Sequence, residues 1–268
     1  MKRNLLSLLA IIICSNLFAQ PTQGRIIYER TTQLRIQISN DDPAFSNMIP
    51  KERKDRFELL FANNQTLWRS LPDITEGDDM YFTTEGGAQI RMVMPGADDI
   101  TFTDIPNMRR VEYKELAGKN FIVTDTVNRY DWKLSDETKD ILGHNCRKAT
   151  TVRMQPSMRI NNDNGKITRE EIIDTLNITA WFAPDLPVFA GPLYYQGQLP
   201  GTILEVSEAD GRTTFKAVEI GEKVDVKDIK EPKGGKKITA EAFRKEREAM
   251  FREMQENGGG NMNIRIRN

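Results

Sequence analysis

The sequence predicts a mainly β protein built on one strongly curved antiparallel sheet or half-barrel, followed by a C-terminal helix. Most of the chain between residues 25 and 126 alternates apolar and polar residues with period two, which is typical of half-buried strands. Clusters of Gly, Asp and Asn, such as 85–87 and 118–120, separate the alternating segments. Strands joined by such short turns pair antiparallel, because parallel strands need long crossovers.

The expected strands occupy residues 25–38, 56–70, 80–84, 88–94 and three segments between 99 and 126. One hairpin can be registered from the sequence of residues 202–220. Asp210-Gly211 suits a two-residue turn, which pairs Val206 with Phe215 and Leu204 with Ala217. The apolar residues then share one face of the hairpin, and Glu205 meets Lys216 on the other.

Two segments are not expected to be regular sheet. Residues 154–173 are polar and rich in turn formers, which indicates a protruding, mobile hairpin or loop. Residues 183–201 contain Pro184, Pro187 and Pro192, which lack the N–H that strand pairing needs. We expect this second segment to be a fixed, irregular crossover that lays its apolar residues over the sheet, namely Leu186, Val188, Phe189, Leu193 and Leu199.

The N-terminus has the three parts of a secretory signal. Lys2 and Arg3 precede an apolar run, and a cleavage site is expected before Gln20, so residues 1–19 form the predicted signal peptide. No later stretch approaches the roughly 20 apolar residues of a membrane span. The expected organisation then comprises an antiparallel β domain (20–230), a linker (231–238), an amphipathic helix capped by Thr239 (239–256) and a disordered tail (257–268).

The composition excludes several classes of function. Loss of Lys2 and Arg3 leaves 36 basic and 39 acidic residues, a net charge of −3, so no basic excess attracts nucleic acid. After cleavage Cys146 is the one remaining cysteine, which excludes an intramolecular disulfide. The chain has one histidine, His144, and lacks the usual nucleophile, zinc and phosphate-loop motifs. We therefore expect a protein without enzymatic activity or cofactor.

A metal site is the alternative. On a strand, His144, Cys146 and Met154 lie on one face, and these residues are soft ligands suited to Cu(I), with Met92 and Met94 as further donors. Under this hypothesis the protein handles copper in the periplasm. The competing interpretation is that Cys146 is a small buried residue at the start of a core strand.

Aromatic residues form a second candidate set. Trp132, Trp181, Tyr194 and Tyr195 are interpreted either as the wall of a binding groove or as ordinary cover for both faces of a strand. Together with the turn that follows, they give the candidate binding residues, namely Trp132, Trp181, Tyr194, Tyr195, Leu199, Pro200 and Gly201.

The segments "DWKLSDETKDILGHNCRKAT" (131–150) and "AWFAPDLPVFAGPLYYQGQLPGTILEV" (180–206) resemble the signature of the GLPGLI family of exported Bacteroidetes proteins. Gln198 and Thr202 replace a Gly and a Leu of that signature, and His144 replaces an aromatic residue. The resemblance implies a cell-envelope location, frequently beside TonB-dependent outer-membrane transport systems. The strand pattern is also similar to the curved sheet of lipoprotein carriers, an analogy of fold alone.

These observations predict a non-enzymatic binding or accessory protein of the cell envelope. Its curved sheet would be presented to a hydrophobic ligand, an extended peptide or an outer-membrane β-barrel partner such as a TonB-dependent transporter.

Overall fold

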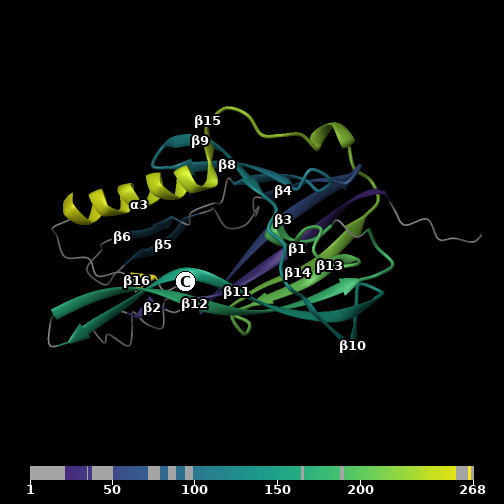
Figure 1. Ribbon diagram of the computed structural model, residues 1–268, viewed down its shortest axis with the longest axis horizontal. Coiled ribbons are helices and arrows are strands. Elements are labelled where there is room, and N and C mark those ends of the chain that lie inside the picture. The colour runs from purple at the N-terminus through teal and green to yellow at the C-terminus, as the bar shows by residue number, and fades with distance from the viewer. Residues whose placement is uncertain are drawn as a thin grey trace, which may run out of the picture.

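A computed structural model describes residues 22–34, 36–37, 51–71, 79–83, 89–93, 99–163, 166–187, 190–257 and 265–266. The expected signal peptide and most of the expected disordered tail lie outside these ranges. The described residues form one large open sheet with a helix near one edge (Figure 1). This confirms the mainly β, curved antiparallel fold that the sequence predicts.

The large sheet has the strand order β10-β11-β12-β13-β14-β1-β3-β4-β7-β8-β9-β15. All neighbours pair antiparallel except β15 and β9. The strands are β1 (Gln23–Gln33), β3 (Glu52–Ala62), β4 (Gln65–Leu71), β7 (Ile100–Asp104), β8 (Arg109–Leu116), β9 (Lys119–Thr126), β10 (Lys133–Ile141), β11 (His144–Asp163), β12 (Lys166–Ala183), β13 (Thr202–Glu208), β14 (Thr213–Gly221) and β15 (Lys236–Thr239). Two small pairs join β2 (Ile36–Gln37) to β16 (Arg265–Ile266) and β5 (Asp79–Thr83) to β6 (Gln89–Val93).

The sheet curls around an aromatic core. Tyr28 of β1, Trp68 of β4 and Cys146 of β11 belong to one buried cluster, although β4 and β11 are far apart in the strand order. Trp68 stacks on Phe57 with ring centroids 5.0 Å apart and lies 5.4 Å from the Tyr28 ring. Such pairs contribute about 0.5–1.5 kcal/mol each beyond their buried area. We call the face that carries Tyr28 and Trp68 the inner face.

The β13–β14 hairpin has the predicted register with a longer turn. Val206 pairs with Phe215 and Glu205 with Lys216, but the ladder closes at Glu208–Thr213 and leaves four residues in the loop, 209–212. The N–H of Ala209 donates to the carbonyl of Asn177 in β12, at 2.9 Å. This bond holds the turn against β12. Ala209 can make it because it lies outside the β13–β14 ladder, which a two-residue turn at Asp210-Gly211 would not allow.

Residues 154–173 are strand rather than loop. β11 and β12 pair continuously from Arg147–Phe182 to Asp163–Lys166, and in Figure 1 they run past the rest of the sheet. The expectation of a protruding hairpin is therefore confirmed, and the expectation that it lies outside regular sheet is wrong. Pairing satisfies the peptide groups of both strands, whatever the polarity of the side chains.

The crossover between β12 and β13 covers the inner face, as the sequence predicts. Leu186 joins the core around Tyr28, and Leu199 is buried in an adjoining cluster. The Tyr28 hydroxyl donates to the carbonyl of Ile203 at 2.7 Å, where the crossover returns to the sheet. A short 3-10 helix, η2 (Leu193–Tyr195), lies in its middle. Residues 188 and 189 lie outside the described residues.

The segment expected as a linker ends in β15, which adds a parallel strand beside β9. Helix α3 (Ala240–Asn257) follows it directly, and the Thr239 hydroxyl accepts the N–H of Ala242 at 3.2 Å, so the predicted cap is confirmed. Phe243 buries its ring against Phe121 of β9, with centroids 5.4 Å apart. The helix therefore packs on the sheet. No helix of the described residues is long and apolar enough to cross a membrane.

Candidate functional site

The fold separates the predicted aromatic set into groups. Trp132 and Tyr195 belong to one cluster, with ring centroids 6.2 Å apart, and Leu199 is buried with them. Trp181 packs against the core around Tyr28, and the ammonium of Lys139 lies 5.4 Å from its ring centroid. These residues therefore do not form one continuous wall.

The turn of residues 198–201 follows the aromatic segment. It is held by a backbone hydrogen bond from Gly201 to Leu199 and by the side chain of Gln198. Pro200 is exposed and Gly201 is buried. The Gln198 side chain accepts the N–H of Tyr130 at 3.1 Å and donates to the carbonyl of Asn128 at 2.6 Å. Its side chain fastens the crossover to the segment between β9 and β10.

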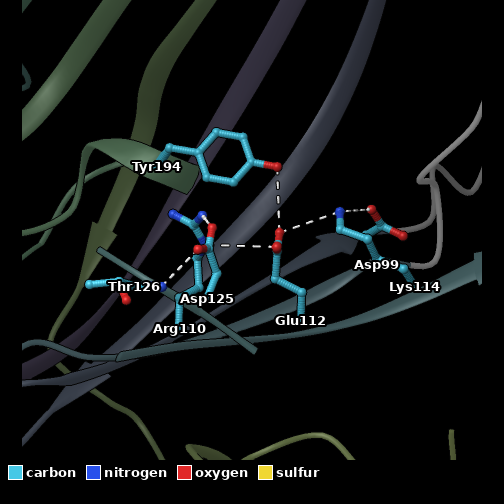
Figure 2. A network of polar contacts seen from close by, with 7 residues as sticks. All are labelled: Asp99, Arg110, Glu112, Lys114, Asp125, Thr126 and Tyr194. Carbon is cyan, nitrogen blue, oxygen red and sulfur yellow. Dashed lines mark hydrogen bonds and ion pairs between the residues drawn. The ribbon is translucent and has the colours of Figure 1, made fainter. Parts of the chain in front are cut away.

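Tyr194 marks a network of buried charges on the inner face of β8 (Figure 2). Arg110 and Glu112 are 7% and 4% exposed, and Arg110 Nε lies 3.7 Å from Glu112 Oε2. Arg110 also pairs with Asp125 of β9. Lys114 extends the network, with its Nζ 3.3 Å from Glu112 Oε1 and 2.8 Å from Asp99 Oδ2.

The crossover closes this network from above. The guanidinium of Arg110 lies 4.7 Å from the Tyr194 ring centroid, and the Tyr194 hydroxyl donates to Glu112 at 3.4 Å. Burial and the neighbouring Glu112 carboxylate raise the pKa of Tyr194. Burial works against the charged form of Lys114, but attraction to the Tyr194 oxygen, Glu112 and Asp99 outweighs it and raises the pKa of Lys114. Near neutral pH the tyrosine stays protonated and the lysine charged, so neither is poised as a general base.

Three polar atoms beside the network have no hydrogen-bond partner among the described residues. They are Thr103 Oγ1, Arg110 Nε and Gln196 Nε2. Thr103 pairs with Arg110 across β7 and β8, and Gln196 accepts a hydrogen bond from Thr66 of the adjacent β4. Since all three residues are buried, these atoms are polar groups under the crossover whose hydrogen bonds are not satisfied within the described residues.

The candidate copper ligands do not converge. His144 Nδ1 lies 2.7 Å from Asp185 Oδ2, and the Cys146 thiol donates to the His144 carbonyl at 3.5 Å. Met154 is 72% exposed and lies eight residues further along β11, roughly 26 Å in an extended strand. No group of three metal-binding His, Cys, Asp or Glu side chains occurs in the described part of the chain. The side chain of Met92 and all of Met94 lie outside the described residues.

Cys146 is expected to resist thiol reagents in the folded protein. Its side chain has no exposed surface, and burial, with the neighbouring Asp185 and Asp140, raises the pKa of the thiol to about 11. At pH 8 the thiolate is therefore scarce and shielded. Ellman's reagent should label Cys146 only after denaturation, and rapid labelling of the native protein would contradict this placement.

The exposed apolar residues gather elsewhere, on the long hairpin. β10 pairs with β11 only as far as Thr150, and β13 pairs with β12 only as far as Ile178. We call the two-stranded part beyond these points, residues 151–163 and 166–177, the ribbon. Val152, Met154 and Ile173 of the ribbon are 56%, 72% and 66% exposed.

Register brings these three residues together. Val152 lies opposite Asn177, and Met154 lies opposite Thr175, two residues from Ile173. Diagonal neighbours of this kind are within contact distance for long side chains. No charged residue occurs among these five, so they form an uncharged and partly apolar surface. The sequence offered Met154 only as a metal donor, because the extent of the free ribbon depends on where β10 and β13 end.

The fold and these sites define a mainly β protein with an open curved sheet, a covered inner face and a projecting ribbon. Residues 132–205, from β10 to β13, match the family described as "Protein of unknown function (Porph_ging)". No curated protein matches the chain. Two solved structures of PNGF-II, in space groups P21 and C2, are similar at 16% identity, with TM-scores of 0.48 and 0.49. The similarity covers 85% and 83% of this chain, which spans about a third of theirs (33% and 32%).

Proposed function

We propose that the protein is a non-enzymatic binding module of the cell envelope, exported with removal of residues 1–19, that docks a partner protein through the ribbon. The observation that carries the proposal is the exposed, uncharged surface of Val152, Met154 and Ile173. Apolar residues gathered on a projecting element are typical of interaction sites.

The occupied inner face supports docking over ligand carriage. A carrier would leave the inner face of its sheet free for a ligand. In this protein Leu186, Tyr195 and Gln196 of the crossover are buried on that face. Gln196 is bonded to Thr66, and Tyr194 lies against Arg110. An apolar ligand on this face would have to displace these contacts, whereas Val152, Met154 and Ile173 of the ribbon are already exposed.

The chemistry of the buried groups supports a role without catalysis. The charges of Arg110, Glu112 and Lys114 are paired with one another or with aspartates, and the network holds the crossover. The resemblance to the GLPGLI signature adds a context, since it implies a location beside TonB-dependent outer-membrane transporters. A β-barrel protein of that membrane is therefore the partner that we propose.

The proposal predicts that a charge on the ribbon abolishes partner capture. Val152→Asp or Met154→Asp should lower the yield of a cross-linked complex in intact cells by at least about tenfold, because docking would bury the new carboxylate. Val218→Asp on β14 is the matched control, since Val218 is also exposed, at 40%, but lies far from the ribbon. Each complex would be quantified by immunoblot and its partner identified by mass spectrometry.

Ligand carriage makes the opposite prediction. A carrier would release a stoichiometric lipid or other apolar small molecule when the purified protein is denatured, and it would bind equally well with Asp at position 152. That result, or turnover of a substrate by the purified protein, would overturn the proposed function.

A further inference from the structure

We propose that the partner contributes an extended β-strand, which pairs with the free edge of β12 in the ribbon and continues the line of β13. This inference rests on the proposed function and specifies its partner as a strand-donating segment. It follows from the directions of the backbone groups of the two ribbon strands, which two hydrogen bonds of β12 and one pairing between β11 and β12 indicate.

The first contact lies where β13 leaves the sheet. The carbonyl of Asn177 accepts the N–H of Ala209 in the β13–β14 turn, at 2.9 Å. The peptide groups of Asn177 therefore point toward the β13 side of β12. From residue 177 back to Lys166 this side of β12 has no paired strand among those that the structure describes.

The second contact indicates that the peptide groups of Thr175, two residues before Asn177, point in the same direction. The N–H of Thr175 donates to the side chain of Asp174, at 2.9 Å. Because peptide groups alternate in direction along a strand, Ile173, Thr175 and Asn177 all present their N–H and C=O groups to the free edge. The Asp174 carboxylate thus covers an edge donor that a docking strand would take over.

The pairing of β11 with β12 argues against strand addition at the opposite edge of the ribbon. Pro156 of β11 lies opposite Ile173. Since the peptide groups of Ile173 point outward, this is a non-hydrogen-bonded pair, and the backbone of Pro156 also points outward, on the β11 side. Proline has no N–H to offer there, which is a common way to block strand addition. The β12 edge of residues 166–177 contains no proline.

The surface beside this edge defines the incoming strand. Ile173 and Thr175 stand next to Met154, so a strand on β12 would place every second side chain along this uncharged, partly apolar row. Apolar or β-branched residues at alternate positions would extend the row, and a charge there would be left facing Ile173. The partner segment is therefore an extended strand with alternating apolar residues and no proline at its paired positions.

The test uses Thr175→Pro and Thr175→Val in the full chain. The proline removes the edge N–H, and its ring obstructs the incoming strand, while the ladder to β11 does not use this N–H. The valine keeps the N–H and removes only the hydroxyl. Cross-linked complex in cells should fall about fivefold or more with Thr175→Pro and remain at the wild-type level with Thr175→Val. Asp174→Ala should raise it, because the edge donor is no longer covered.

A second measurement does not depend on the folding of the proline variant. A photo-cross-linking amino acid at position 173, 175 or 177 should attach to partner residues that also advance in steps of two, as paired strands require. Steps of three or four would indicate a helix, and attachment to lipid or to a second copy of this chain would identify another occupant. Each of these outcomes overturns the inference.

The two proposals fail differently. If Val152→Asp abolishes the complex while a folded Thr175→Pro protein binds as well as wild type, the partner docks on the apolar surface without adding a strand. The function proposed above then stands and the strand inference falls. If neither substitution changes the yield of complex, the ribbon is not the docking surface and both are wrong.

Discussion

Replacing Gly201 with alanine is expected to destabilise the protein by about 3 kcal/mol, near the upper end of overpacking costs, and to lower its Tm by roughly 6–12 °C. A Cβ at this position would lie 2.2 Å from the carbonyl oxygen of Ala183 and 2.9 Å from Cα of Pro184. Both neighbours are backbone atoms, so no side-chain rotation relieves the contact. The crossover would have to move away from the end of β12, and with it the buried Leu199 and Ile203. Urea denaturation followed by tryptophan fluorescence measures the loss.

Gly221→Ala is the matched control. Gly221 ends β14, and a Cβ there would meet no atom within 4 Å. The same substitution should therefore change the free energy of unfolding by no more than about 1 kcal/mol, in the stabilising direction if at all. Equal effects of the two alanines would show that the approach of Gly201 to Ala183 does not constrain the crossover.

The hairpin and the crossover could be predicted because several local signals agree. Around Val206 and Phe215 the turn dipeptide and the apolar alternation demand the same register, and the structure has it. In the crossover, Pro184, Pro187 and Pro192 each exclude strand pairing, so an irregular path follows from the backbone chemistry alone. The reason why Gly201 must be glycine depends on Ala183, which is a contact between segments that only the fold brings together.

β15 could not be predicted, because its strand arises from tertiary pairing. Residues Lys236–Thr239 are largely polar and follow Gly234-Gly235, and this pattern is typical of a linker. A Cβ on Gly235 would lie 2.8 Å from the backbone of Asn120 and Phe121, so the close approach of β9 depends on glycine there. Nothing within the segment itself indicates the parallel pairing with β9.

The candidate site was predicted in part. Tyr194 was singled out, but its charged neighbours were not, because Arg110, Glu112 and Lys114 alternate along a strand as residues of a solvated face do. They are covered by a crossover that lies far along the chain, since Tyr194 follows Glu112 by 82 residues. The free ribbon was missed for a related reason, since it is defined by where its neighbouring strands stop.

Substitution of Arg110 by methionine is expected to cost about 3–5 kcal/mol, the range for breaking a buried ion pair by removing one partner. Methionine fills much of the same space, so the loss measures charge and hydrogen bonding more than volume. Glu112, which is 4% exposed, would retain its interactions with Lys114 and Tyr194 but lose the ion pair with the guanidinium of residue 110. Asp125 would also lose its ion pair with that guanidinium. The Tyr194 ring would lose the cation that lies against it.

Arg109→Met tests whether burial is the cause. Arg109 is the adjacent residue of β8 and also pairs with a carboxylate, Glu231, but the two side chains are 40% and 44% exposed. Exposed pairs contribute about 0–1 kcal/mol, so this variant should unfold almost as the wild type does. Thermal and urea unfolding of both variants give the comparison. An equal loss in the two would show that the network under Tyr194 stabilises the crossover no more than a surface ion pair does.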